Sequence, residues 1–247
     1  MKIALIGYGK MGKMIESLVK ENGTHEIGLI ISSQNNLHAN IDRLKLCDAV
    51  IDFSVTDAVI YNAKIALDSG KPFIIGTTGW YDNLTELQNI CKQKNGSVVY
   101  GSNFSTGVNL FFALNDFLAN LMKTGKNYSA SIEETHHTQK KDAPSGTGIT
   151  LANSIIEKRK WLNNWKLKSD SSVNEHELSI TSNRIGDVIG DHKVIYKSAH
   201  DEISITHSAF DRKGFAEGAI VAAEWALNKK GFYSFREVVS EMIAEVE

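Results

Sequence analysis

The segment 2–19 constrains the fold of this chain more than any other. An apolar run at 2–6 leads directly into a glycine-rich loop, and apolar residues then recur at helical spacing over 14–19. The loop has the pattern Gly-x-Gly-x-x-Gly and consists of Gly7, Tyr8, Gly9, Lys10, Met11 and Gly12. A strand, this loop and a helix in that order are typical of a dinucleotide-binding unit, because the glycines let the backbone turn tightly and approach a pyrophosphate closely. We therefore expect the loop to bind a cofactor; the alternative is a glycine-rich turn that serves packing alone.

Strand-like and helix-like patterns alternate through the first hundred residues. Apolar runs that predict strands lie at 27–31, 49–53, 72–75 and 98–100. Helical patterns lie between them at 58–67 and 84–94. Strands separated by helices of this length predict an α/β fold with a Rossmann-like, doubly wound parallel sheet. The stretch 33–48 is polar and shows no clear helix, so we expect a short or irregular crossover there.

Small and hydroxyl-bearing residues follow two later strands of this predicted sheet. In doubly wound sheets, ligands bind beyond the carboxyl ends of the strands. Ordinary turns are the alternative for each segment, but several strand ends that point the same way favour a shared cofactor site. The candidates are Gly76, Thr77 and Thr78 after one strand and Gly101, Ser102, Asn103 and Phe104 after the next.

The pattern changes after Phe104. An apolar helix is predicted at 108–121, and alternating segments at 128–134, 175–182, 192–196 and 202–207 predict strands with one crossover helix at 149–158. This arrangement predicts a second α+β domain with a mixed sheet. The stretch 158–173 fits neither pattern, and helical patterns at 215–228 and 235–244 are expected to return to the first domain.

The segment 134–147 carries the chemistry-bearing side chains of the second half. It holds the adjacent imidazoles His136 and His137, two lysines, and a predicted helix start at Ser145-Gly146-Thr147. A helix start presents free backbone N–H groups and the positive end of the helix dipole, so with a lysine it forms a receptor for carboxylate or phosphate. A histidine beside it can donate a proton near neutral pH. The alternative is a solvated polar loop.

Other function classes are disfavoured by composition. The formal net charge is −2, and acidic and basic residues are interspersed, so we expect no nucleic-acid or anionic-membrane partner. The apolar run at 2–6 is too short for a signal peptide or a membrane span. Cys47 and Cys91 are isolated, which favours reduced thiols in the cytoplasm. We expect no metal, because adjacent imidazoles in an extended segment point apart and no suitably spaced carboxylate follows.

Together these motifs resemble one known family. The chain resembles the 4-hydroxy-tetrahydrodipicolinate reductase family, also called dihydrodipicolinate reductase, of lysine and diaminopimelate biosynthesis. The motifs that carry the resemblance are Gly7 to Gly12, Ile51 to Ser54, Gly76 to Gly79, Asn103 to Asn109, Glu134 to His137, Lys140 to Thr147, Arg184 to His192, Ile205 to His207 and Phe215 to Ala219.

The resemblance implies an organisation and a reaction. It implies a cofactor domain at 1–105 and 213–247, and a substrate domain at 106–212 whose sheet assembles a homotetramer. The implied reaction is NAD(P)H-dependent reduction of a small dicarboxylate ring, by hydride transfer with protonation from a histidine. It implies His136 as the proton donor with Lys140 as its partner, and substrate contacts at His137, Ser145, Gly146 and Thr147. The implied cofactor positions are those named above.

Cofactor choice depends on the end of the strand predicted at 27–31. An acidic residue often stands there and binds the ribose 2′-hydroxyl, but this chain has Ser32 and Ser33. The missing carboxylate removes a repulsion against a 2′-phosphate, and serine hydroxyls can bind one. We therefore lean to NADPH, with NADH also used.

Two other functions compete with this interpretation. A nicotinamide-dependent dehydrogenase for amino acids or sugars would share the first domain, but a sugar has no pair of carboxylates for the helix start to bind. A non-catalytic nucleotide sensor would have no need for His136 and Lys140.

Overall fold

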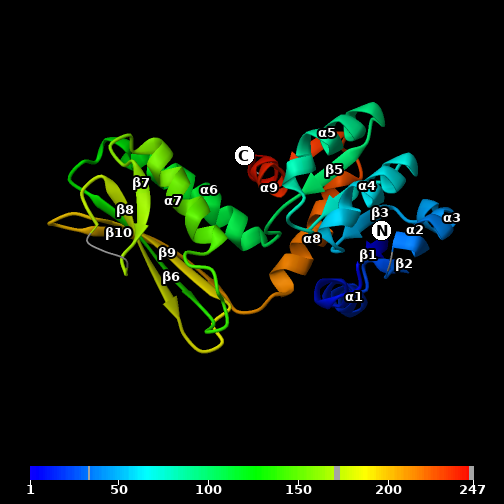
Figure 1. The fold of residues 1–247 in the computed structure, drawn as a ribbon, viewed down its shortest axis with the longest axis horizontal. Helices are drawn as coiled ribbons and strands as arrows, with labels where there is room; N and C mark the ends of the chain where they lie inside the picture. Colours follow the sequence, from blue (N-terminus) through cyan, green and yellow to red (C-terminus); the bar gives the residue numbers. More distant parts are fainter. Residues whose placement is uncertain (33, 170–172, 245–247) are drawn as a thin grey trace. The chain divides into compact units, whose positions relative to one another are not determined.

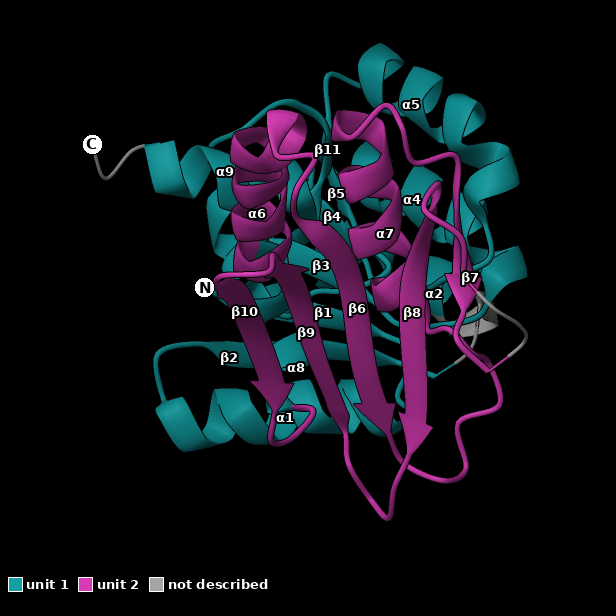
Figure 2. Cartoon of the chain, turned by 90° about the vertical axis from the view of Figure 1, so that its left-hand side faces the viewer, with its two compact units in different colours: residues 1–109, 213–247 teal, residues 110–212 magenta. Residues whose placement is uncertain are grey.

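The computed structural model describes residues 1–32, 34–169 and 173–244. They form two compact units (Figure 1, Figure 2): unit 1 comprises residues 1–109 and 213–247, and unit 2 comprises residues 110–212. The sequence placed the corresponding divisions at 105/106 and 212/213.

Unit 1 is built on a six-stranded sheet in which every neighbouring pair is parallel. Its order is β11-β5-β4-β3-β1-β2. The strands are β1 (Lys2–Ile6), β2 (Glu26–Ile31), β3 (Ala49–Asp52), β4 (Phe73–Ile75), β5 (Ser97–Tyr100) and β11 (Gly231–Ser234). The direction of winding reverses between β1 and β3, so the loops after these two strands diverge at the sheet edge and leave a crevice. The predicted Rossmann-like class is confirmed.

Helices cover both faces of this sheet. One face carries α1 (Lys10–Asn22), α8 (Lys213–Ala226) and α9 (Phe235–Ala244), and the other carries α2 (Gln34–Ala39), α3 (Ile41–Lys45), α4 (Val59–Asp68) and α5 (Leu84–Gln93). Alternate strand residues feed two separate cores: Ile3 and Leu5 pack against α1 and α8, while Ala4 and Ile6 face the other layer. Burial on both faces explains why these strands are almost uninterrupted apolar runs.

Two parts of unit 1 differ from the sequence prediction. The stretch 33–48 contains two short helices, α2 and α3, which are anchored by the fully buried Leu37 and Leu44. Each is too short to show helical periodicity, so packing rather than pattern determines them. The strand β11 was missed because it has four half-buried residues and pairs with β5, which lies far away in the sequence.

Unit 2 contains a five-stranded mixed sheet in the order β10-β9-β6-β8-β7. The strands are β6 (Ser129–His136), β7 (Asn164–Leu167), β8 (Glu177–Arg184), β9 (Gly190–Lys197) and β10 (Glu202–Ala209). β8 is parallel to β6 and β7, whereas β9 is antiparallel to β6 and β10. The mixed sheet is as predicted, except that β7 occupies part of the unassigned stretch 158–173. Residues 170–172 of that stretch lie outside the described residues.

Two helices lie on one face of this sheet, as Figure 2 shows: α6 (Thr106–Leu121) and α7 (Gly146–Lys158). They are tied together by a hydrogen bond from the Asn115 side chain to the Leu151 carbonyl, at 3.2 Å. Short 3-10 turns occur at Thr56–Ala58, Tyr81–Asn83 and Met122–Thr124. Among the described residues, no helix combines the length and apolarity that crossing a membrane would require.

One glycine in α8 makes a close contact with the backbone possible. A Cβ atom at Gly218 would lie 1.6 Å from the Phe104 carbonyl oxygen, whereas one at Gly214 would meet only the Ser105 hydroxyl, at 3.7 Å. We expect Gly218→Ala to lower the free energy of unfolding by at least about 2 kcal/mol, because backbone must move to make room. Gly214→Ala in the same helix should be neutral or stabilising by up to about 1 kcal/mol. Urea unfolding of the two variants tests this, and equal effects would contradict it.

Candidate functional site

The glycine loop connects β1 to α1, and its three glycines have different roles. Gly7 has a positive φ of 86°, and a Cβ there would lie 2.2 Å from the Phe53 carbonyl oxygen. A Cβ at Gly12 would lie 2.3 Å from the Gly7 carbonyl oxygen. Gly9, the N-cap of α1, has open space where a Cβ would stand. The outer glycines therefore shape the turn, and the middle one leaves room for a ligand at the helix start.

Two adjacent pockets lie at this edge of the sheet. One has a volume of about 510 Å³ and is lined by residues following β1, β2 and β3, including Gly7, Gly9 and Ser32. The other, of about 430 Å³, is lined by Gly9, Lys10, Met11, Gly76, Thr77 and Thr78 together with residues after β3. Phe53, Ser54 and Val55 line both pockets. The structure therefore brings most predicted cofactor positions together at the point where the winding reverses.

Some predicted cofactor positions are used differently. The Tyr8 hydroxyl donates a hydrogen bond to Glu16, so its side chain is held against α1. The Phe104 side chain is buried and packs against Phe235, with ring centroids 4.8 Å apart. Gly101 and Asn103 follow β5 at the same edge of the sheet, where Gly101 N–H donates to the Ile75 carbonyl. Ser102 lies between them, and Ser33 lies outside the described residues.

A buried carboxylate that sequence reasoning left without a role supports these pockets. Asp52 is fully buried at the end of β3 and accepts hydrogen bonds from Ser54, Asn62 and Thr77. Burial raises the pKa of Asp52, and the hydrogen bonds from Ser54, Thr77 and Asn62 oppose that shift. All these groups donate to the carboxylate, so Asp52 links the loops after β3 and β4 to α4. The sequence signal that could have identified this residue is an acidic side chain at the end of an apolar strand.

In unit 2, the loop that joins β6 to α7 collects the predicted substrate and proton-transfer residues. His136 is the last residue of β6 and is buried, with its Nδ1 lacking a hydrogen-bond partner among the described residues. A Cβ at Gly190 of β9 would lie 3.2 Å from His136 Nε2, so the absence of a side chain there makes room for the imidazole. His137 follows the strand and is half-buried.

The first turn of α7 has the geometry of an anion receptor. Ser145 is the N-cap, and its hydroxyl accepts a hydrogen bond from Gly148 N–H at 3.1 Å. The Ser145 N–H and hydroxyl both donate hydrogen bonds to Glu134. Ser145 was predicted to contact the substrate, but its donors are already engaged within the protein. Within the described chain, no hydrogen bond occupies the N–H groups of Gly146 and Thr147, and the space beside the Gly146 Cα is open. Those two N–H groups are available to a carboxylate.

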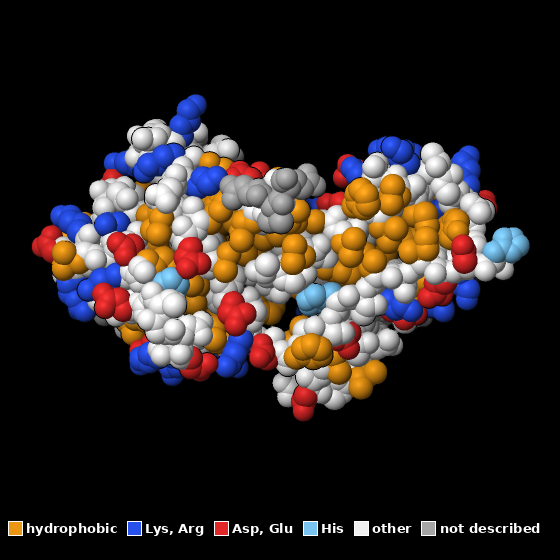
Figure 3. Space-filling view, turned by 180° about the vertical axis from the view of Figure 1, so that it is seen from behind, with side chains coloured by type: hydrophobic (Ala, Val, Ile, Leu, Met, Phe, Trp, Pro, Cys, Tyr) orange, Lys and Arg blue, Asp and Glu red, His pale blue; other side chains and the backbone are white. Residues whose placement is uncertain are grey.

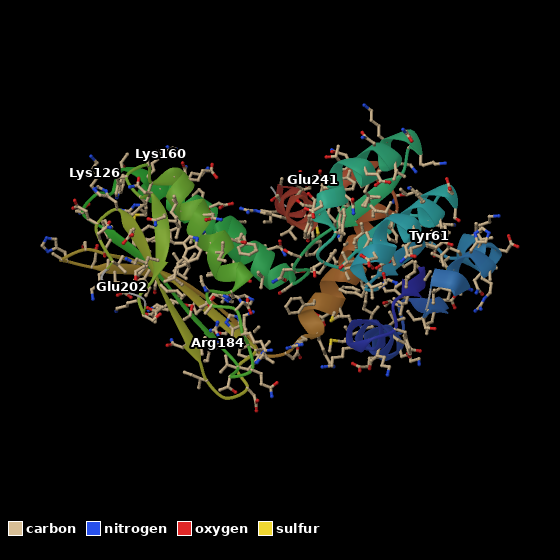
Figure 4. All side chains as sticks on the ribbon, viewed as in Figure 1. Tyr61, Lys126, Lys160, Arg184, Glu202 and Glu241 are labelled. Carbon is tan, nitrogen blue, oxygen red and sulfur yellow. The ribbon has the colours of Figure 1, made fainter. Side chains whose placement is uncertain are left out.

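Charged side chains surround this turn. Lys140 Nζ lies 2.8 Å from Asp142 Oδ2, and this hydrogen bond lowers the pKa of the Asp142 carboxyl. Arg184 of β8, labelled in Figure 4, donates to the backbone carbonyls of Lys140 and Asp142 and thereby supports the loop. Arg184 was quoted in a motif but given no role, since no sequence pattern shows that its strand lies beside this loop.

The environment of His136 favours its neutral form in the free protein. Burial lowers the pKa of His136, and the positive charges of Lys140 and Arg184 lower it further, whereas Glu134 and Asp142 act in the opposite direction. A dianion bound at this site would therefore raise the pKa and favour the imidazolium.

Three buried groups lie close enough to raise the question of a metal. One ligand atom from each of Glu134, His136 and His192 lies within 4.8 Å of the others. However, the Glu134 carboxylate already accepts hydrogen bonds from Ser145 and Ser182. These hydrogen bonds hold the loop in place, and a metal ion could bind Glu134 only by displacing them. The expectation of a metal-free site stays a prediction.

Comparisons with known proteins decide the family. Residues 1–104 match the family model described as dihydrodipicolinate reductase, N-terminus, and residues 107–239 match the corresponding C-terminus model. The chain belongs to the dihydrodipicolinate reductase family. Members of this family are pyridine-nucleotide-dependent oxidoreductases, so the resemblance and the enzyme class expected from sequence are confirmed.

Relatives in the dihydrodipicolinate reductase family match nearly the whole chain. A 4-hydroxy-tetrahydrodipicolinate reductase of Christiangramia forsetii is 42% identical over 242 residues, covering 98% of this chain and 99% of the relative. One from Methanocorpusculum labreanum is 36% identical and covers 96% and 98%. Dipicolinate-bound dihydrodipicolinate reductase from Paenisporosarcina sp. TG-14 has a TM-score of 0.76 at 19% identity, covering 96% of this chain and 99% of that structure. At this identity the last comparison supports the fold alone.

Stability of this dihydrodipicolinate reductase family member at acidic pH should depend on His192, which is buried. Burial, followed by the nearby His136, lowers the pKa of His192 from 6.5 to about 4. An unfolded histidine takes up a proton below about pH 6.5 while the folded one resists until about pH 4, so stability is lost as pH falls through this window. The loss amounts to about 3 kcal/mol. We expect His192→Gln to show a weaker pH dependence of the unfolding free energy than the wild type over this window; parallel curves would be inconsistent with this origin.

Proposed function

We propose that this chain reduces 4-hydroxy-tetrahydrodipicolinate (dihydrodipicolinate) to tetrahydrodipicolinate with NAD(P)H in lysine and diaminopimelate biosynthesis. The observation that carries the proposal is the β6–α7 loop, which gathers an imidazole, an ammonium group and two free N–H groups at a helix start. This combination suits a ring with two carboxylates that must also accept a proton. The 42% identity to a reductase of this name supports the same substrate.

Unit 1 has a site that fits the cofactor. The pyrophosphate of the cofactor would bind beside Gly9 at the start of α1. The rest of the cofactor would contact Ser32, Thr77 and Thr78 in the two pockets. When bound, the reduced nicotinamide supplies the hydride. No carboxylate stands at Ser32 to repel a 2′-phosphate, which supports a preference for NADPH over NADH.

Unit 2 supplies the contacts to the two carboxylates. Gly146 and Thr147 would bind one through their N–H groups, and Lys140 and His137 would bind the other. Hydrogen bonds that involve a charged group contribute about 1.5–3 kcal/mol each. Binding of the dianion would also draw Lys140 away from Asp142, with which it is paired in the free protein.

His136 donates the proton in this proposal. The free protein keeps its pKa low mainly through burial, and two substrate carboxylates would compensate the positive charges of Lys140 and Arg184. The imidazolium would therefore form when the substrate binds. Its proton would go to the ring centre next to the one that accepts the hydride, which leaves the imidazole neutral for the next cycle.

A homotetramer in the cytoplasm completes the proposal. The residues of α6 support an oligomer interface, because Phe111 and Phe112 are buried, while Leu110, Leu114, Phe117 and Leu121 are exposed. Figure 3 shows hydrophobic side chains gathered on the face of unit 2 that carries α6. Cys47 and Cys91 are buried free thiols, which supports a reducing compartment.

Single substitutions test the role of His136. We expect His136→Gln to lower kcat by about 10²–10⁴-fold, because the general acid is lost. Lys140→Ala should reduce turnover and weaken substrate binding. The assay couples dihydrodipicolinate synthase to this enzyme and follows the disappearance of reduced-nicotinamide absorbance. Cofactor affinity should be unchanged in both variants, and the exposed His200→Gln serves as the matched control. Full turnover by His136→Gln would refute the assignment.

Steady-state KM values for NADPH and NADH test the cofactor preference. We expect the lower KM for NADPH, because Ser32 places a hydroxyl where a carboxylate would repel the 2′-phosphate. A KM for NADH that is lower by about tenfold, equivalent to about 1.4 kcal/mol, would overturn this preference.

A further inference from the structure

Glu134 is a fully buried charged side chain of unit 2 that the proposed reaction does not use. Its carboxylate is completely inaccessible to solvent, and it lies on β6 two residues before His136. Side chains two residues apart on a strand point to the same face of the sheet. Glu134 and His136 therefore share one side of β6, the side that faces α7.

Hydrogen bonds connect this carboxylate to the start of α7. Glu134 Oε1 accepts from Ser145 N–H at 2.9 Å and from the Ser182 hydroxyl at 2.9 Å, while Oε2 accepts from the Ser145 hydroxyl. A Cβ at Gly148 would lie 2.6 Å from Oε2, so the glycine there lets the first turn of α7 approach this carboxylate without displacing it. Burial alone would raise the pKa of Glu134, but the hydrogen bonds from Ser145 and Ser182 outweigh it and lower the pKa. The carboxylate is therefore ionised at neutral pH.

His192 completes the network from the opposite strand. It pairs with Glu134 in the β6–β9 register, and its Nε2 lies 3.3 Å from the Ser145 hydroxyl oxygen. That hydroxyl donates to Glu134, so His192 Nε2–H acts as the donor to it. The His192 ring also packs edge-on against the His136 ring, with centroids 5.0 Å apart. His192 thus contacts both the N-cap of α7 and the proposed proton donor.

We propose that Glu134, assisted by His192, is the positioning residue of this site: it fixes the first turn of α7 against β6 and supplies the negative charge that faces His136. This inference rests on the proposed function, in which that turn binds a carboxylate and His136 donates the proton. Glu134 itself touches neither substrate nor cofactor in this account. It acts through Ser145 on one side and through the charge balance of His136 on the other.

Several charged groups face His136, and only one of them is a buried anion. Glu134 lies on β6 and Arg184 on β8, while Lys140 and Asp142 come from the loop; the neutral His192 ring faces it from β9. Asp142 is exposed and paired with Lys140. Removing the charge of Glu134 therefore leaves the histidine facing mainly cations. A nearby opposite charge changes a pKa by about 1–3 units.

The test uses Glu134→Gln, which keeps the shape and removes the charge. The pKa of His136 is measured by NMR titration of its imidazole in the absence of substrate, with the signal assigned through His136→Gln. We expect the pKa to fall by about one unit or more, and the alkaline limb of the kcat/KM profile to move to lower pH with it. Glu133→Gln, which removes the same charge from the adjacent exposed position, should leave both unchanged.

If the Glu134→Gln variant folds and its His136 pKa is unchanged, the inference is overturned. A residue with a purely structural role would change the stability of the protein at every pH without changing the His136 pKa. The NMR result does not depend on turnover. A fully active His136→Gln would therefore refute the proposed function separately.

If Glu134→Gln does not fold, Glu134→Asp provides the second arm. It keeps the charge but is one methylene too short to maintain the bonds to Ser145. We expect a nearly unchanged His136 pKa and an affinity for dipicolinate weakened by about tenfold, equivalent to about 1.4 kcal/mol. Wild-type affinity for dipicolinate would overturn the inference.

Discussion

Burying a carboxylate costs several kilocalories per mole unless donors surround it, and both units of this protein are organised around meeting that requirement. Asp52 in unit 1 accepts hydrogen bonds from the hydroxyls of Ser54 and Thr77, and Glu134 in unit 2 accepts them from the hydroxyls of Ser145 and Ser182. Each carboxylate ties a loop at a strand end to neighbouring structure. The loops that carry the proposed sites are thereby held by buried carboxylates.

This construction explains how the polar segment after β6 adopts a defined structure. The loop after β6 contains small and charged residues, and Pro144 is its one buried apolar side chain. Its shape comes instead from Glu134 beneath the α7 start and from Arg184, which donates to two of its carbonyls. Because the hydrogen-bonding groups of Ser145 are consumed in this way, the adjacent N–H groups of Gly146 and Thr147 are the ones left for a ligand.

The sequence was sufficient for the fold class because its strands and glycine loop are local signals. Residues 2–12 show strand and turn directly, and the confirmed parallel sheet follows from the alternation after them. Short elements such as β7 and β11 were missed because pairing with a distant strand, rather than their own pattern, makes them extended.

The candidate site was only partly predictable for a related reason. His136, Lys140 and Gly146 lie within one segment, so their proximity follows from the chain itself. Glu134 and His192 meet only through the register of β6 and β9, which no local pattern reveals. His192 was placed in a predicted strand, and the sequence offered no way to see that its ring contacts His136.

In the proposed function, the first turn of α7 receives a carboxylate of the substrate. Titration of ¹⁵N-labelled protein with dipicolinate, followed through the backbone amide signals, tests this contact. We expect the Gly146 and Thr147 amides to show the largest shifts and to saturate together with the imidazole signals of His136. Saturable binding that leaves these two amides unmoved while shifting signals elsewhere would contradict it.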